Sequence, residues 1–332
     1  MFENRLKCVS ERLQDRECNT HTSSTRKGIA VSTGSKFVKS QSAMEYLMTY
    51  GWAILIIAVV LAALFELGVF NPLTFAPKAS PGSCQVVRPE GAGTTNFISL
   101  AGECNGEIPQ YVASFNGQNS YIEQQNGFAF MNNAAQPFSI SIWVDPASSN
   151  GVIVDELGQL TPNTGWHDSW VELVNGNVYI RVWSLSCVSL GAIPLKQWSN
   201  IVMTGSVSGS TITYSGYING LFRNSGSGSR SVPGGTALMY YPLGTADSTN
   251  CGSGAYFSGS MSNYQIYNTS LSANEIQYLY TEGIGGAPIK IQNLVAWYPL
   301  NGNTNDYSGN GYNGTAIGVT YNTNWYSGYS TP

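Results

Sequence analysis

The chain has 332 residues, of which 42% are hydrophobic and 10% charged, and its formal net charge is −4. Residues 1–40 hold eight of the fifteen Lys and Arg residues and four of the nineteen acids, so residues 41–332 carry a formal charge of −8. An acidic body with seven basic residues excludes nucleic acid as a partner, because phosphates need a basic surface. The hydrophobic content also argues against a disordered chain.

A long apolar segment follows the basic stretch. Residues 52–70 are nineteen residues with Glu66 as their only charge, enough to cross a bilayer as a helix rising about 1.5 Å per residue. We expect Pro72 to end this helix. The basic residues before it predict a cytoplasmic N-terminus and an external C-terminal part.

The basic stretch and the apolar segment together have three interpretations: a secretory signal, a simple anchor and a prepilin-type leader. The residues at the boundary between them distinguish these. A secretory signal has a shorter apolar core, of about 7–15 residues, with its cleavage site after it. Here residues 39–57, KSQSAMEYLMTYGWAILII, resemble the class III signal peptide of archaeal type IV pilin-like proteins. That resemblance implies cleavage by a prepilin-type peptidase between Ser40 and Gln41, which makes Glu45 the fifth mature residue.

Glu45 has a chemical reason to lie at this position. Cleavage before Gln41 creates an α-amino group beside a helix that becomes buried among its neighbours, and a buried ammonium group is costly unless it is paired. Glu45 lies one turn along, where it can pair with the amine of an adjacent subunit. The alternative is that Glu45 lies in the interfacial layer of a plain membrane anchor.

The sequence predicts four regions. Residues 1–40 are the leader, within which residues 1–30 resemble an over-extended gene start and Val31 is the candidate initiation site. Residues 41–70 are the transmembrane or pilin core helix, and residues 71–109 are a linker followed by a hairpin. The remaining residues, 110–332, form the extracellular body.

Four cysteines remain after the leader. An even number in an exported chain indicates disulfides, although four cysteines allow three connectivities. We favour Cys84–Cys104, which closes a hairpin loop, and Cys187–Cys251 in the larger domain; the alternative is buried free thiols. Zinc is not expected, because there is no C-x-x-C motif and His167 is the only histidine after the leader.

The body is a succession of short β-type runs broken by Gly and Asn turns. Several runs alternate apolar and polar residues, and Asn-Gly-Asn at 175–177 predicts a hairpin turn. One short helix is expected where Ser272 and Glu275 form a capping box. Strands at this spacing without long helices predict an antiparallel sandwich or jelly roll. The expected strands are 111–115, 138–144, 151–157, 170–174, 178–183, 198–207, 211–218, 238–243, 255–267 and 294–300.

Several of these segments together carry a family resemblance. The Phe-Asn-Gly turn at 115–117, the strand containing Trp143, the strand from Trp198, the hairpin at 217–220 and the closing run at 258–276 resemble a laminin-G-like jelly roll. This is the architecture of the concanavalin A-like lectins and glucanases. The resemblance covers residues 110–282.

The segment at 294–315 is displaced relative to the family. LVAWYPLNGNTNDYSGNGYNGT normally opens the domain, whereas here it follows the rest. The chain therefore resembles a circularly permuted jelly roll whose first strand comes from residues 291–320. Two alternatives are a truncated second repeat and a strand donated to a neighbouring subunit. The expected fold class is α+β, a long N-terminal helix followed by this antiparallel sandwich.

The architecture includes glycoside hydrolases, so an enzyme is one alternative that the acidic residues can test. Retaining cleavage needs two carboxylates about 5–5.5 Å apart. The nearest approaches in this sequence are Asp155 with Glu156, which face opposite sides of one strand, and Asp168 with Glu172. We therefore predict a protein that is not an enzyme.

Glycan binding is the favoured chemistry, because sugars bind to flat aromatic faces flanked by polar side chains. The alternative is that the aromatic side chains fill the core or its rim, as we expect for Trp143, Trp183, Trp198 and Trp297. The candidate ligand-binding residues are Trp166, His167, Asp168, Trp170, Tyr240 and Tyr241.

Two surface features complete the candidate sites. Many laminin-G-like domains hold calcium, and Asn303, Asp306 and Asn310 could offer oxygen ligands in a Gly-rich loop; the alternative is an Asx-turn loop. N-x-Ser/Thr sequons at Asn268 and Asn313 predict glycosylation of an exported domain.

The favoured hypothesis is a pilin-like filament subunit or cell-surface adhesin with a glycan-binding head, anchored by one helix with its C-terminal domain outside. Its expected partners are the membrane before assembly, sister subunits, the prepilin-type peptidase and an extracellular glycan or cell-surface ligand. The alternatives are a membrane-anchored monomeric lectin and a secreted polysaccharide-degrading enzyme.

Overall fold

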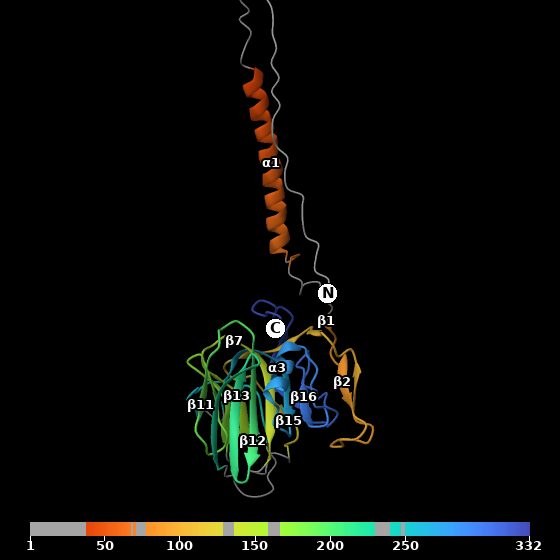
Figure 1. Cartoon of the computed structure of the whole chain (residues 1–332), viewed down its shortest axis with the longest axis vertical. Coiled ribbons are helices and arrows are strands. Elements are labelled where there is room, and N and C mark those ends of the chain that lie inside the picture. The colour runs from red at the N-terminus through yellow and green to blue at the C-terminus, as the bar shows by residue number, and fades with distance from the viewer. Residues whose placement is uncertain are drawn as a thin grey trace, which may run out of the picture. The chain divides into compact units, whose positions relative to one another are not determined.

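A computed structural model describes residues 38–67, 69–70, 78–128, 136–158, 167–229, 240–246 and 250–332. The chain divides into two compact units, Met1–Phe70 and Asn71–Pro332 (Figure 1). Most of the predicted leader, including Val31, and also Pro72 and Trp166 lie outside the described residues.

The first unit contains the helix α1, Val38–Glu66. Within it, Met44–Glu66 has 23 residues with a mean hydropathy of 2.4, enough to cross a membrane by length and composition. Every side chain of this segment is exposed except that of Leu64, which is partly covered. The apolar surface therefore extends around the whole helix rather than along one stripe.

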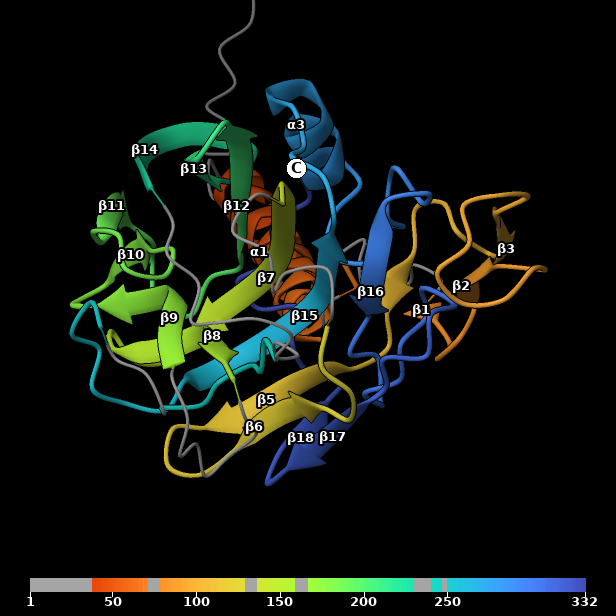
Figure 2. The ribbon, with the colours of Figure 1, turned by 90° about the horizontal axis from the view of Figure 1, so that it is seen from below.

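The second unit is a sandwich of antiparallel strands, which confirms the predicted fold class (Figure 2). Its large sheet has the order β14-β13-β12-β7-β15-β5-β18, and β16 also pairs with β15. The strands of this sheet are β14 (Leu221–Ser229), β13 (Thr211–Ile218), β12 (Ser199–Ser208), β7 (Phe138–Pro146), β15 (Ser258–Tyr267), β5 (Val112–Asn116), β18 (Thr320–Asn322) and β16 (Leu294–Tyr298).

The second layer has the order β11-β10-β9-β8. Leu243 bridges both Val154 of β8 and Ile122 of β6, and so joins this sheet to the β6–β17 pair. The strands of the second layer are β11 (Val188–Ala192), β10 (Asn177–Ile180), β9 (His167–Val174), β8 (Gly151–Leu157), β6 (Tyr121–Gln124) and β17 (Gly314–Ile317).

Alternation of side chains builds the core between the layers. Ile140 and Ile142 of β7 and Ile201 of β12 belong to the same buried cluster as Val154 and Val178 of the second layer. Each fully buried aliphatic side chain of this kind contributes about 1.5–3 kcal/mol. The core therefore carries most of the stability of the second unit.

The C-terminal segment completes both layers within the same chain. Tyr298 of β16 pairs with Tyr264 of β15, β17 pairs with β6, and β18 pairs with β5. In Figure 2 these blue strands lie beside β15 and beside the yellow β5 and β6. This is the arrangement expected of a circular permutation.

Local features follow the sequence closely. The turn between β9 and β10 has positive φ at Asn175 (49°) and Gly176 (79°), as a two-residue hairpin turn requires. The helix α3 (Ala273–Thr281) begins with the predicted capping box of Ser272 and Glu275.

Both favoured disulfides, Cys84–Cys104 and Cys187–Cys251, are present. Strands β2 (Cys84–Val87) and β3 (Ser99–Gly102) form a hairpin. The first disulfide links Cys84 in β2 to Cys104, two residues after the end of β3. Cys84 and Val86 share a buried cluster with Trp297, so the hairpin packs on the jelly roll. A two-residue parallel pair, β1 (Lys78–Ala79) with β4 (Ile108–Pro109), lies at the start of the unit.

Candidate functional site

The backbone brings part of the predicted ligand site together at one end of the second layer. Leu157 pairs with His167 across β8 and β9 and, on its other side, forms a bridge with Tyr240. Leu157 and Tyr240 exchange two backbone hydrogen bonds of 2.9 Å. His167 and Tyr240 are therefore two strands apart, on either side of Leu157, and the side chains of His167 and Asp168 lie outside the described part of the structure.

Trp170 and Tyr241 are core residues, so the prediction that they contact a ligand is wrong. Both side chains are 0% exposed, and their ring centroids lie 4.4 Å apart. Trp170 also packs against Phe138 of the opposite layer at 4.4 Å. These rings fill the space between the two layers and present no face to a sugar. Trp143, Trp198 and Trp297 are buried as expected, while Trp183 is half-buried.

Three of the acids considered for catalysis, Asp155, Glu156 and Glu172, accept hydrogen bonds from the segment that follows Tyr240. Glu172 accepts hydrogen bonds from the backbone amides of Cys251 (2.7 Å) and Ser253 (2.8 Å). Tyr241 donates to Glu156 at 3.1 Å, and Thr245 donates to Asp155. All three carboxylates are 0% exposed. Their contacts give these acids a structural role in holding the segment against the second layer.

The Gly-rich loop after β16 is organised around Asp306. One carboxylate oxygen accepts hydrogen bonds from the backbone amides of Trp297 (2.9 Å) and Ser308 (2.8 Å). The other accepts from the Ser308 hydroxyl (2.8 Å) and the Tyr312 amide (2.9 Å). Both oxygens are thus engaged by the chain itself.

The two asparagines of the proposed calcium site are engaged in the same way. Asn303 Oδ1 accepts from the Asn305 amide at 3.0 Å, and Asn310 Oδ1 accepts from the Gly93 amide at 2.8 Å. Calcium requires several oxygens converging with free lone pairs. The three side chains fit the alternative, an Asx-type loop, better than a cation site. No group of three His, Cys, Asp or Glu side chains in the described ranges is placed to hold a metal ion.

A feature that the sequence did not reveal is the environment of Arg88. The side chain is 9% exposed and donates to four carbonyls, those of Thr94, Ser308, Ile291 and Leu294. Burial lowers the pKa of the guanidinium group, and the nearby Asp306 opposes that change. Arg88 therefore joins the β2–β3 hairpin to the C-terminal segment.

A hollow of about 300 Å³ lies beside this arginine, and we call it the Arg88 hollow. Its volume is at the lower end of the range for small-molecule sites. Aromatic, amide and guanidinium groups border it, together with the sequon residue Asn268. Its lining includes Arg88, Gly93, Asn268, Gln292, Asn310 and Tyr312.

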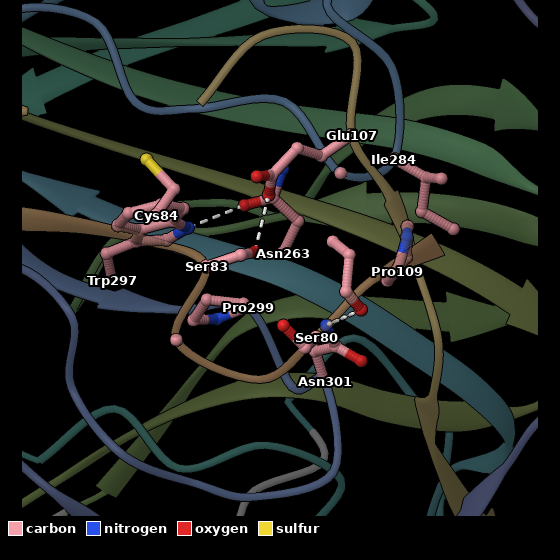
Figure 3. A pocket seen from close by; sticks show the side chains of 13 residues that line it. Ser80, Ser83, Cys84, Glu107, Pro109, Asn263, Ile284, Trp297, Pro299 and Asn301 are labelled. Atoms are coloured by element: carbon pink, nitrogen blue, oxygen red, sulfur yellow. Dashed lines mark hydrogen bonds between the residues drawn. The ribbon is translucent and has the colours of Figure 1, made fainter. Parts of the chain in front are cut away.

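A second cavity, shown in Figure 3, is too small for a ligand. It holds about 20 Å³, enough for a water molecule, which needs about 10–15 Å³. Ser83 donates to Glu107 at 3.1 Å, and the Trp297 indole donates to Asn263 at 2.8 Å. Burial raises the pKa of Glu107, and the hydrogen bond from Ser83 opposes the shift.

Two antiparallel layers closed by a C-terminal strand define a jelly-roll sandwich. Residues 116–277 match the laminin-G family model described as the concanavalin A-like lectin/glucanases superfamily. This region is therefore similar to the concanavalin A-like jelly roll, and its antiparallel sandwich agrees with the sequence resemblance. No curated protein matches the chain.

Three solved structures illustrate the similarity. A candidate carbohydrate-binding protein from Bacteroides ovatus is 14% identical with a TM-score of 0.45; the match covers 68% of this chain and 63% of that protein. The heptameric SAP-like pentraxin of Limulus polyphemus is 14% identical (TM-score 0.42; 64% and 94% covered). The CBM40 of the Ruminococcus gnavus IT-sialidase, bound to α2,3-sialyllactose, is 14% identical (TM-score 0.36; 51% and 96%).

Proposed function

We propose that this chain is a single-pass membrane protein that assembles as a pilin-like subunit and displays a glycan-binding jelly roll outside the cell. The observation that carries the proposal is α1, whose apolar surface is uncovered on every side. The segment Met44–Glu66 has 23 residues, which as a helix extend about 35 Å and match a bilayer core of about 30 Å.

Two apolar environments can cover such a helix in turn. Leu55 and Ile56 are 52% and 58% exposed, like most of their neighbours. Lipid covers these side chains before assembly, and sister helices cover them in a filament, because a bundle interior and a bilayer core are similar solvents. A plain anchor would use only the first environment.

Glu45 supports the pilin-like alternative. The helix is continuous from Val38 through Gln41 and Glu45, so cleavage before Gln41 would leave the new amine on the first turn. The Glu45 side chain is exposed and forms no ion pair within the described residues. It is available to an amine of a neighbouring subunit.

The two disulfides support display outside the cell, because such bonds persist in oxidising surroundings. The family description includes lectins, which supports a glycan ligand. We propose that this ligand binds at the end of β8 and β9, where the backbone of His167 and the residue Tyr240 lie on either side of Leu157 and Asp168 is next along β9.

Replacing Glu45 by glutamine is expected to leave membrane insertion unchanged and to lower the yield of sheared filaments at least tenfold, because an unpaired buried amine costs several kcal/mol. Filament and membrane fractions are compared by N-terminal mass spectrometry, and the wild-type filaments should begin at Gln41.

The matched control is Glu66→Gln, which removes the same charge at the other end of α1. It should leave the filament yield unchanged. An intact leader found only in membranes would replace the pilin-like proposal with a plain membrane-anchored lectin.

Replacing Tyr240 by alanine is expected to weaken glycan binding of the full chain about tenfold, because one aromatic face contributes about 1–1.5 kcal/mol. Binding is measured on a glycan array and then by calorimetry with the strongest ligand. The control is Tyr278→Ala on α3, whose ring is 54% exposed away from the proposed site. Equal losses in both variants would contradict this location.

A further inference from the structure

The two sequons lie in different surroundings. Asn268 follows the last residue of β15, in the bend before α3, and its side chain is exposed. Its Oδ1 accepts a hydrogen bond from Asn293 Nδ2 at 2.9 Å. Its own Nδ2, the atom that would carry a sugar, has no partner within the described part of the chain.

Asn313 is held within the loop that Asp306 organises. Its side chain is half-buried, and its Oδ1 accepts a hydrogen bond from the Asp306 amide at 2.9 Å. Its carbonyl accepts from the Gln125 amide at 2.8 Å, and the next residue, Gly314, is buried against Thr304. A glycan on Asn313 would require this loop to open.

The Arg88 hollow lies directly beside Asn268, which forms part of its wall. The Arg88 guanidinium group and Asn310 Nδ2 donate hydrogen bonds to backbone carbonyls, so these two side chains form a fixed wall of the hollow. Gln292 and Thr95 are exposed, and their side chains form no hydrogen bond among the described residues. The hollow thus offers an amide, a hydroxyl and the half-buried ring of Tyr312 to a polar ring of sugar size.

We propose that Asn268 carries an N-linked glycan whose first sugars occupy the Arg88 hollow, and that Asn313 is unmodified. The donor is a lipid-linked oligosaccharide. Asn268 Nδ2 forms a bond to the anomeric carbon of the sugar, the bond from that carbon to the lipid phosphate oxygen breaks, and the amide releases one proton as the lipid phosphate leaves. The proposal rests on the export of the body proposed above.

Trypsin places the two sequons on different fragments, so the attachment of sugar to each asparagine can be measured separately. It cuts after Arg230 and Lys290 and at no site between them, so Asn268 lies in fragment 231–290 and Asn313 in fragment 291–332. The protein is taken from its native cells, reduced, digested and analysed by mass spectrometry. Sugar is expected on the first fragment alone and should disappear in Asn268→Gln.

Surface labelling of the same intact cells separates the two proposals. A labelled protein without sugar on fragment 231–290, or with sugar only on fragment 291–332, overturns the glycan at Asn268 and leaves the proposed function standing. A protein that is found only inside the cell overturns the proposed function, and the glycan with it.

Occupation of the hollow is tested by thermal unfolding. Asn268→Gln is expected to lower the melting temperature by about 2–4 °C in the native host and to leave it unchanged in a host that lacks the glycosyl transferase. Gln292→Ala should lower it only in the glycosylated protein, whereas the control Gln118→Ala, another exposed glutamine, should not. Equal melting temperatures with and without the glycan would overturn the proposal that its first sugars occupy the Arg88 hollow.

Discussion

Replacing Arg88 by lysine is expected to lower the free energy of unfolding of the body by about 3 kcal/mol. The guanidinium group donates hydrogen bonds to four backbone carbonyls from three segments. A lysine ammonium group lacks this planar arrangement of donors and cannot reach all four carbonyls. Each buried carbonyl left without a donor costs about 1–3 kcal/mol. The measurement is denaturant unfolding of the detergent-solubilised full chain with its disulfides intact.

The matched control is Arg223→Lys on β14, where the side chain is exposed. It should change the free energy of unfolding by less than about 0.5 kcal/mol. Equal effects of the two substitutions would show that Arg88 does not join the hairpin to the C-terminal segment.

Removing residues 294–332 is expected to prevent the body from folding as a monomer. The deletion takes away β16, β17 and β18 and exposes the edges of β15, β6 and β5. It also removes five large buried side chains, those of Leu294, Val295, Trp297, Tyr298 and Leu300. Since each such side chain contributes about 1.5–3 kcal/mol, the loss is comparable to the whole stability of a domain, about 5–15 kcal/mol.

Limited proteolysis and size-exclusion chromatography measure the result. Co-expression of residues 291–332 as a separate chain should restore protease resistance, because the strand can re-enter the sheet from outside. The full chain should unfold with a midpoint independent of its concentration if the segment closes its own sandwich. A truncated monomer that keeps the protease resistance of the full chain would contradict the permuted closure.

The features that sequence predicted correctly depend on neighbouring residues. The capping box needs only Ser272 and Glu275, and the turn at Asn175 and Gly176 needs only its own backbone preferences. The family resemblance supplied the long-range order, including the displaced first strand. Those contacts could be expected because the jelly roll fixes which strands are neighbours.

The ligand site was harder to predict because β8, beside it, is buried at every residue. Tyr240 and Leu243 pair with the edge of β8, so Tyr241 between them is buried although it lies next to a strand edge. The β8–β9 register also shifts between Val154 and Asp155, which pair with Val171 and Ser169 and leave Trp170 without a partner residue. Strict alternation could not place this residue.

Arg88 was invisible to sequence reasoning for a different reason. Three of its four acceptors are carbonyls more than 200 positions away along the chain, and a carbonyl carries no residue-specific signal. Asp306 could be read as a calcium ligand or as the centre of an Asx loop. The choice depends on where the backbone amides of Trp297 and Tyr312 point, which only the folded chain shows.

The permuted order of the strands has a mechanical consequence. In the proposed membrane-anchored protein, tension transmitted from α1 enters the described part of the body at Lys78, whose ammonium group lies 4.5 Å from the centre of the Tyr326 ring. The entry segment continues to Arg88, which is bonded to carbonyls on both sides of β16. Under the proposed function, tension on the body is therefore carried to β16, the strand that closes the sandwich.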